Sequence, residues 1–341
     1  AFLGVFCKPI IVTLPLTLMV IEIFLLEEKD LKTLKGWIRL LPYIGVAAIV
    51  PVLLSLWYLD SAKLSDVSQM TRLTESISRT EYLFTQFNVL MNYLKLFVLP
   101  LNQNLDYDFP LAQTLMEWPT FFSFLILLGL LFLAGALFKR NRLLSFCIVF
   151  FFGTLSLESS IFPLPDVIFE HRLYLPIIAL CLLFSYGLDV SFSCPRVRNI
   201  ITVLLILFFS VMSLQRNIIW SNKYTLLGDV LSKSPNKARV HNSLGLAYAQ
   251  DELYEEAVAA FTQAGFLAPA YLKAYNNRAN VYRLMGQYEQ ALEDYEKVLS
   301  LDPDFSMGYF FRSKTNDAMG HCHEAVQDAL KARKLGFPVD Q

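Results

Sequence analysis

Apolar runs of membrane-spanning length fill residues 1–219 and constrain the fold more than any other feature of this sequence. A helix needs about 20 apolar residues to cross the hydrocarbon core of a bilayer, and shorter runs must recruit flanking residues. Backbone polar groups inside a bilayer have to be paired within the protein, so these runs predict helices. The predicted spans are residues 1–26, 40–59, 121–138, 143–157, 173–190 and 200–214.

The composition of the chain supports a membrane protein. Hydrophobic residues make up 55% and charged residues 17% of the 341 residues, whereas a soluble domain is nearer one quarter charged. The apolar excess ends near Trp220, so we expect a membrane domain over 1–219 and a polar domain after it. A net charge of −1 gives no indication of a nucleic-acid partner. The five cysteines show neither disulfide nor zinc-site spacing, so no metal site is predicted from them.

The distribution of basic side chains predicts which loops face the cytoplasm. They gather in the three loops 27–39, 139–142 and 195–198. These loops share one side of the membrane only if the apolar but amide-containing stretch 82–100 does not cross it. We therefore expect 82–100 to form a helix at the interface or against the other spans. Loops 60–118 and 158–172 and the polar tail then face the opposite side.

A sequence period begins at Ala238 and has the length of a tetratricopeptide repeat, about 34 residues. Small residues, aromatic residues and a terminal proline recur at this spacing, as expected where paired helices pack closely. The predicted repeats are 238–271, 272–305 and a less regular 306–339, preceded by a connecting and capping helix over 220–237. The predicted fold is all-α: a polytopic membrane helical domain followed by an α-solenoid.

The first helices of stacked repeats line a concave surface. The side chains predicted on this surface are Arg239, Asn242, Lys273, Asn276, Asn280 and Arg283. They are polar and basic, which fits a groove for a polypeptide but also fits an ordinary solvated surface. The repeat fold alone does not decide which partner binds there.

Charged residues beside the apolar runs are candidates for a substrate site, because charge near a bilayer core usually has a function. Glu170, His171 and Arg172 lie just before a predicted span and either bind an anionic lipid-linked substrate or form a structural cluster. Asp106 and Asp108 either bind a divalent cation or substrate hydroxyl, or form a solvated turn.

Lys8, inside the first apolar run, is the remaining candidate of this kind. It either meets a lipid phosphate or extends its ammonium group to the interface. The chain begins within this run at Ala1, so we expect it to be the later part of a longer protein.

Several motifs occur together in an order that resembles a known family. They are Lys8 with Thr13-Leu14-Pro15-Leu16, Pro100-Leu101 before Asp106-Tyr107, Glu170 to Pro176, and Arg216-Asn217 with Trp220, running to Ser234-Pro235. With the repeats, this combination resembles the transmembrane and tetratricopeptide-repeat O-mannosyltransferases and their bacterial relatives. The resemblance implies that residues 1–219 are the C-terminal part of a GT-C-type membrane glycosyltransferase fold.

The resemblance also implies a reaction. Such enzymes transfer a sugar, here expected to be mannose, from a polyprenyl- or dolichyl-phosphate carrier to protein hydroxyls on the lumenal or periplasmic face. The membrane would be that of the endoplasmic reticulum or the bacterial inner membrane. The family's catalytic carboxylate lies in a first loop that would precede Ala1, so no residue of this chain is assigned that role. Lys8, His171 and Arg172 become candidates for the carrier phosphate, with Glu170 beside them.

Two other functions remain open on the sequence. A membrane-anchored repeat scaffold would assemble partner proteins without catalysis. A polymerase or ligase of lipid-linked polysaccharide would carry similar repeats. No cofactor is predicted apart from the divalent cation that Asp106 and Asp108 are candidates to hold.

Overall fold

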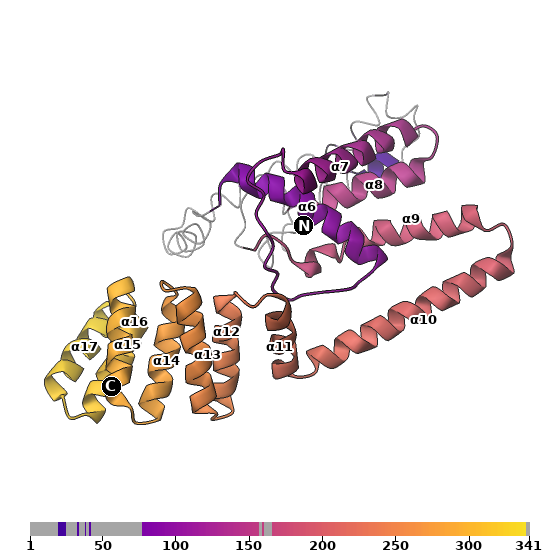
Figure 1. The fold of residues 1–341 in the computed structure, drawn as a ribbon. Helices are drawn as coiled ribbons and strands as arrows, with labels where there is room; N and C mark the ends of the chain where they lie inside the picture. Colours follow the sequence, from indigo (N-terminus) through magenta and orange to yellow (C-terminus); the bar gives the residue numbers. More distant parts are fainter. Residues whose placement is uncertain are drawn as a thin grey trace. The chain divides into compact units, whose positions relative to one another are not determined.

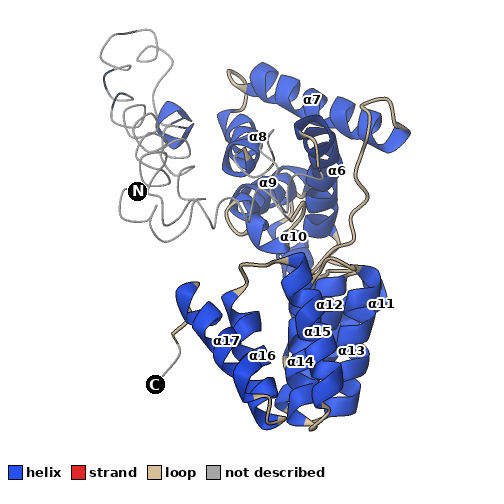
Figure 2. Cartoon of the chain, turned by 90° about the vertical axis from the view of Figure 1, so that its left-hand side faces the viewer, coloured by secondary structure: helices blue, strands red, loops and turns tan. Residues whose placement is uncertain are grey.

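A computed structural model describes residues 20–24, 33, 38, 41, 77–156, 159 and 166–338. All regular elements within these ranges are helices (Figure 2), so the predicted all-α fold is confirmed there. Lys8 and most of the predicted spans 1–26 and 40–59 lie outside the described residues.

The chain divides into two compact units. The first comprises residues 1–103 and 109–210, and the second comprises residues 104–108 and 211–341. The division falls after Ser210, inside the helix Pro195–Trp220. The boundary expected near Trp220 is the end of this helix, ten residues later. The short segment 104–108 is grouped with the repeats although its sequence neighbours belong to the first unit.

The first unit is built from apolar helices. They are α6 (Arg79–Val98), α7 (Trp118–Leu137), α8 (Arg142–Leu155), the 3-10 helix η2 (Glu170–Leu173), α9 (Pro176–Ser191) and the beginning of α10 (Pro195–Trp220). The helix starts follow from local chemistry: the Ser78 side chain caps α6 in a capping box with Glu81, and the Asn141 side chain caps α8. α9 begins on Pro176, a residue favoured in a first helical turn.

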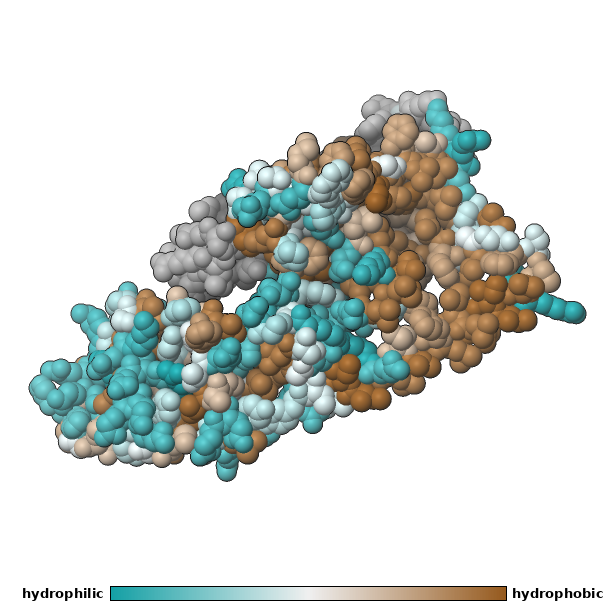
Figure 3. Space-filling model, viewed as in Figure 1, coloured by the Kyte–Doolittle hydropathy of each residue, from teal (hydrophilic) through white to brown (hydrophobic). Residues whose placement is uncertain are grey.

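Two described helices, α7 and α10, are long and apolar enough to cross a membrane. Only 17% of the apolar stretch of α7 and none of that of α10 is buried within the protein, whereas the core helix of a soluble protein would be mostly buried. Hydrophobic side chains cover α10 in Figure 3. The other two predicted spans in this region correspond to α8 and α9, with 14 and 16 residues. Burying so much apolar surface requires a membrane or another apolar surface.

α6, over the stretch predicted as a helix at 82–100, packs against α7 through a polar contact. Asn88 Nδ2 donates to Thr120 Oγ1 at 2.9 Å, and the Ser123 hydroxyl donates to Asn88 Oδ1 at 2.8 Å. Thr120 is fully buried, so these hydrogen bonds satisfy groups that would otherwise be costly to bury. Small hydroxyl residues of this kind join helices in apolar surroundings.

The second unit is a solenoid of helix pairs after a single helix. The elements are α11 (Lys223–Lys233), α12 (Ala238–Gln250), α13 (Tyr254–Leu267), α14 (Leu272–Leu284), α15 (Tyr288–Leu301), α16 (Ser306–Ala318) and α17 (Cys322–Lys334). The first helices of the pairs begin at Ala238, Leu272 and Ser306, so the helix starts keep the period predicted from the sequence. Figure 1 shows α12 to α17 stacked side by side in chain order.

Close helix contacts explain the small residues of the repeat. A Cβ at Gly245 would come within 2.7 Å of the Phe261 ring, and one at Gly265 would come within 3.2 Å of the Tyr275 ring. The aromatic side chains therefore fill the space that each glycine leaves. The predicted spacing of small and aromatic residues thus reflects packing within and between pairs.

The third repeat, less regular in sequence, is held by an ion pair that also occurs in the second. Arg278 donates to Asp294 at 2.6 and 2.7 Å, and at the equivalent positions of the third repeat Arg312 donates to Asp328 at 2.7 Å through two nitrogens. Asn316, at the position that Tyr248 and Tyr282 hold in the first two repeats, donates to the same Asp328 at 3.3 Å. A planar arginine fork therefore joins the two helices of the second pair and of the third pair.

Candidate functional site

Arg172 orders the Glu170–Leu173 turn, η2, together with the loop just before it. The side chain of Arg172 is buried, with 5% of the residue exposed. Its Nη2 donates to the Asp166 carbonyl at 2.8 Å and its Nη1 to the Val167 carbonyl at 3.2 Å. The guanidinium also lies 5.7 Å from the centre of the Phe169 ring. These contacts are those expected of an arginine that holds the shape of its own loop.

Two side chains of α6 also bind the backbone of this loop. The Tyr93 hydroxyl donates to the Phe169 carbonyl at 2.9 Å and accepts from the Phe169 backbone N–H at 3.1 Å. Gln86 Nε2 donates to the Val167 carbonyl at 3.0 Å. Tyr93 and Gln86 are both fully buried, so the loop backbone has exchanged water for fixed donors and acceptors.

The outer side of the turn carries His171 and Glu170. His171 is exposed, with its ring centre 4.9 Å from that of Phe169, and Glu170 is partly buried. An exposed imidazole next to a buried guanidinium can contact a phosphate by hydrogen bonding, with charge added when the imidazole is protonated. The three predicted residues thus lie in one turn, with His171 exposed, Glu170 partly buried and Arg172 buried.

Asp106 lies in the second unit, where it forms an ion pair with Arg239. The carboxylate of Asp106 receives two hydrogen bonds from Arg239, one from Nε and one from Nη2 at 2.7 Å. Lys237 Nζ lies 3.9 Å from Asp106 and 3.8 Å from Asp108. The two carboxylates predicted as a cation or hydroxyl site therefore face two basic side chains. Arg239, predicted on the concave surface, is engaged by one of them.

The segment 104–108 is also fixed through Ser234, which is buried. Asn104 Nδ2 donates to the Ser234 hydroxyl at 2.8 Å, and the Asp108 backbone N–H donates to the same oxygen at 3.0 Å. Neither Ser234 nor Asn104 was predicted from the sequence as a site residue. Nothing in the spacing indicates a pair 130 residues apart, so no local signal would have found it.

The asparagines predicted on the concave surface have different surroundings. Asn242 Oδ1 accepts from Asn277 Nδ2 at 2.9 Å, and Asn280 Oδ1 accepts from the Tyr295 hydroxyl at 2.8 Å. Burial raises the pKa of Tyr295 to about 12, so it remains a donor. Asn276 is 5% exposed, and its Oδ1 is buried without a hydrogen-bond partner in the described structure. That oxygen can accept a further hydrogen bond.

The basic residues predicted on the same surface differ in exposure. Lys273 is exposed, whereas Arg283 is partly buried with its guanidinium 5.8 Å from the centre of the Phe311 ring. Lys273 occupies the position of the second repeat that is equivalent to Arg239 in the first. Both cations are exposed, and Arg239 in addition forms the ion pair with Asp106.

The single helix α11 is attached to α12 through Asp251. Lys223 Nζ donates to Asp251 at 2.7 Å, and the Tyr224 hydroxyl donates to its other carboxylate oxygen at 2.5 Å. The Lys223 bond lowers the pKa of Asp251, and the bond to Asp251 raises the pKa of Tyr224 to about 12.

Among the residues that the structure describes, no three His, Cys, Asp or Glu side chains gather as metal ligands.

Comparisons with known proteins identify the repeats and a set of relatives. Residues 238–264 and 272–305 each match a family model of the tetratricopeptide repeat. Human Protein O-mannosyl-transferase TMTC3 is 26% identical over 182 residues, or 51% of this chain and 20% of that protein. Protein O-mannosyl-transferase Tmtc2 of Drosophila melanogaster is 36% identical over 95 residues, or 27% of this chain and 10% of that protein. The crystal structure of MamA matches at 28% identity and a TM-score of 0.31, covering 32% of this chain and 64% of that one. This chain spans a fifth or less of the length of these two curated relatives.

Proposed function

We propose that this chain, which is similar to the TMTC protein O-mannosyl-transferases and carries tetratricopeptide repeats, is part of a membrane glycosyltransferase that modifies proteins. The observation that carries the proposal is the joining of apolar helices to a repeat solenoid in one chain with these relatives. In the proposed reaction a sugar, expected to be mannose, passes from a polyprenyl- or dolichyl-phosphate carrier to a protein hydroxyl.

The carrier phosphate is proposed to bind at the Glu170–Leu173 turn. Arg172 holds two backbone carbonyls of this loop, and its positive charge is proposed to attract the phosphate electrostatically. His171 contributes the exposed donor, and Glu170 orders it. Lys8, outside the described residues, is proposed as a further cation for the same phosphate.

The acceptor polypeptide is proposed to lie along the first helices of the repeats. Leaving a buried acceptor such as Asn276 Oδ1 unpaired costs about 1–3 kcal/mol, so a backbone N–H of a bound peptide is a favourable partner. Asn242 and Asn280 flank it on the same surface, with Lys273 and Arg283 adding positive charge. The repeats are proposed to face the lumen or periplasm, because the basic loops are assigned to the cytoplasm.

A transfer assay on the full-length protein tests the proposal. Membranes containing it are incubated with a radiolabelled mannosyl-phosphoryl polyprenol, and label in protein O-glycans is measured. We expect His171→Ala and Arg172→Lys to reduce transfer roughly tenfold to a hundredfold, the loss expected for a charge-assisted contact of 1.5–3 kcal/mol. His323→Ala, an exposed histidine of α17, is the matched control and should retain activity. Folded wild-type protein that transfers no label would favour the scaffold function instead.

Peptide binding tests the acceptor part separately. Replacing Asn276 and Asn280 by alanine in the full-length protein should weaken capture of an acceptor peptide, whereas Asn236→Ala, in an exposed turn, should not. Equal capture by the double variant and wild type, both folded, would move the acceptor site off this surface.

A further inference from the structure

The predicted concave surface, formed by the first helices α12, α14 and α16, changes its chemistry along the array. From the first repeat to the third, the second residue of the first helix is Arg239, Lys273 and Met307, and the fifth is Asn242, Asn276 and Phe310. Residues three apart lie on the same face of a helix, so these positions belong to one surface. Two repeats with a cation and an amide are therefore followed by a third in which both positions are apolar.

Segment 104–108 shows what the cation of the first repeat binds. The Asp106 carboxylate accepts two hydrogen bonds from Arg239, so a carboxylate of this chain already engages that position. Lys273 holds the same position in the next repeat, where it is exposed and forms no ion pair within the described residues. Lys273 therefore offers a partner molecule the charge that Arg239 offers to Asp106.

The charges of the first helices favour an acidic partner. α12, α14 and α16 contain one, three and two Lys or Arg residues, respectively, and their single acidic residue is Asp317. The second helix α15, by contrast, contains four acidic residues and one lysine. A polypeptide with an acidic side chain is thus attracted to the first helices, whereas a basic one is repelled.

The third repeat adds an apolar contact beside these cations. Met307 is 40% exposed, and Phe310 and Phe311 are partly buried with ring centres 5.3 Å apart. The Lys314 ammonium group lies 5.7 Å from the centre of the Phe310 ring, and the Arg283 guanidinium lies 5.8 Å from that of Phe311. An apolar side chain that covers Met307 and the phenyl rings would remove apolar surface from water, which favours binding.

We propose that the acceptor polypeptide places an acidic side chain on Lys273 and an apolar side chain on Met307 and Phe310, with its backbone between them donating to Asn276 Oδ1. This inference rests on the proposed function, in which the acceptor lies along the first helices. Packed helices lie about 8–10 Å apart and an extended chain advances about 3.3 Å per residue, so the two side chains are about three residues apart. The Asn276 oxygen is buried without a hydrogen-bond partner in the described structure, which suits a backbone N–H.

Fluorescence anisotropy of labelled synthetic peptides, titrated with the full-length protein in detergent, tests the proposal. The probes contain Asp-Thr-Ser-Phe, or Phe-Thr-Ser-Asp for the opposite chain direction, with Gly-Ser at each end. At least one of the two orders should bind, and replacing its Asp by Asn or its Phe by Ser should weaken binding about tenfold, because each change removes one of the two contacts. Equal affinity of the parent and substituted peptides for the wild-type protein, in both orders, would overturn the proposal.

Variants of the protein identify the positions. Lys273→Glu should weaken binding of the Asp peptide about tenfold or more, because it places two like charges together. It should instead bind a peptide with Arg in place of Asp, whereas Lys297→Glu, the same charge change at an exposed position of the second helix α15, should alter neither affinity. Met307→Ser should remove the preference for Phe over Ser, whereas Leu330→Ser, 61% exposed on the second helix α17, should keep it. Equal binding by Lys273→Glu and Lys297→Glu would overturn the assignment. The peptide substitutions are read on wild-type protein, so they decide the case even where a variant does not fold.

The peptide assay contains no sugar carrier, so it fails separately from the proposed function. Mannosyl transfer by wild-type protein that shows no preference between Asp and Asn peptides would refute this inference and leave the proposed function standing. The predicted preference in a folded protein that transfers no label would refute the proposed function and leave this surface standing as a binding site for acidic segments with an apolar residue.

Discussion

The ion pair between Arg239 and Asp106 makes a testable prediction about how segment 104–108 is held. Arg239→Ala removes two hydrogen bonds from a carboxylate whose side chain is 9% exposed. The nearest cation that remains is Lys237, with its Nζ at 3.9 Å from Asp106. The substitution therefore leaves a nearly buried charge with one weak partner.

The expected loss of stability depends on how deeply each of the two side chains of the ion pair is buried. Breaking a fully buried ion pair costs about 3–5 kcal/mol. The Arg239 side chain is 43% exposed, and solvent screening reduces that value. Hydrogen bonds to charged groups contribute about 1.5–3 kcal/mol, and we expect a loss in this range. Because every 1.4 kcal/mol is a factor of ten, amide exchange in the segment should accelerate roughly tenfold to a hundredfold.

Hydrogen–deuterium exchange of the full chain in detergent measures this effect directly. The Asp108 amide is the best reporter, because it donates to Ser234 and is released when the segment opens. Lys273→Ala is the matched control, since it removes an exposed cation from the equivalent position of the next repeat. Arg239→Lys should give an intermediate rate, because an ammonium cannot form both bonds of the fork. Equal exchange of segment 104–108 in Arg239→Ala and Lys273→Ala would refute the reasoning.

Three further predictions concern the repeats. Glu252 has a φ of 61° at a turn position where the next two repeats have glycine, so Glu252→Gly should raise the free energy of unfolding by about 0.5–1 kcal/mol in denaturant titration. Arg312→Ala removes two hydrogen bonds from the Asp328 carboxylate, whose side chain is 9% exposed, and should destabilise the third repeat by about 1.5–3 kcal/mol. Hydrogen exchange of α17 measures this loss, and Lys314→Ala, at an exposed position, should leave the exchange unchanged. The pKa of Tyr224 is raised from 10.0 to about 12 by its hydrogen bond to a carboxylate, so its stabilising contribution is complete below pH 10 and is lost as the pH rises through 12. Tyrosinate absorbance of wild type against Tyr224→Phe measures that titration, and a midpoint near 10 would contradict it.

The repeats were the most predictable part of the fold, for a physical reason. Helix pairing within a repeat joins residues that are close in the chain, so the small and aromatic residues recur visibly in the sequence. The Arg278–Asp294 pair recurs in the same way and was missed although both members return at the equivalent positions of the next repeat. Comparing charged as well as apolar residues across the period would have found it.

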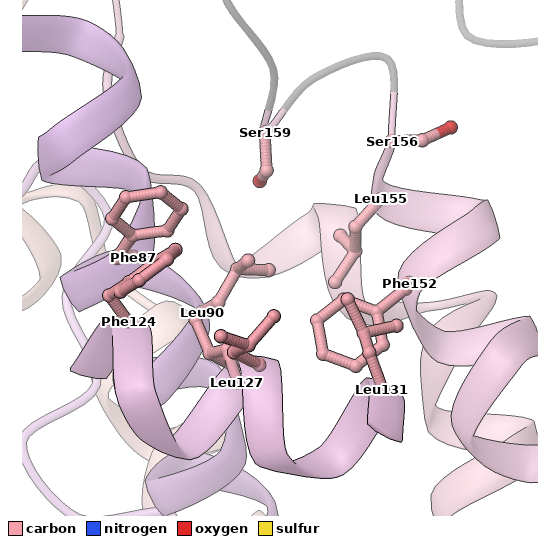
Figure 4. A pocket seen from close by; sticks show the side chains of 10 residues that line it. Phe87, Leu90, Phe124, Leu127, Leu131, Phe152, Leu155, Ser156 and Ser159 are labelled. Atoms are coloured by element: carbon pink, nitrogen blue, oxygen red, sulfur yellow. The ribbon is translucent and has the colours of Figure 1, made fainter. Parts of the chain in front are cut away.

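Contacts between distant segments were not predictable in this way. Gln86 and Tyr93 were recognised only as part of a helix, yet they bind the loop before η2 from 76 to 81 residues away. Such pairs follow no period, because each depends on how loops return to a helix. The cavity lined by Leu127 (Figure 4) could not be predicted either, because its wall is formed by ordinary apolar residues of the three helices α6, α7 and α8.

Residue type alone also failed to separate structural from ligand-facing cations, and the arginines show why. Arg172, Arg239, Arg278 and Arg312 each use at least two guanidinium nitrogens on oxygens of their own chain. A planar fork satisfies two fixed acceptors at once, which makes arginine suited to fastening a loop or a helix pair as well as to binding phosphate. A cation whose fork is already engaged can reach a ligand only with its remaining donors. The exposed His171, on the outer side of the turn that Arg172 holds, is therefore the side chain whose replacement separates phosphate contact from loop stability most cleanly.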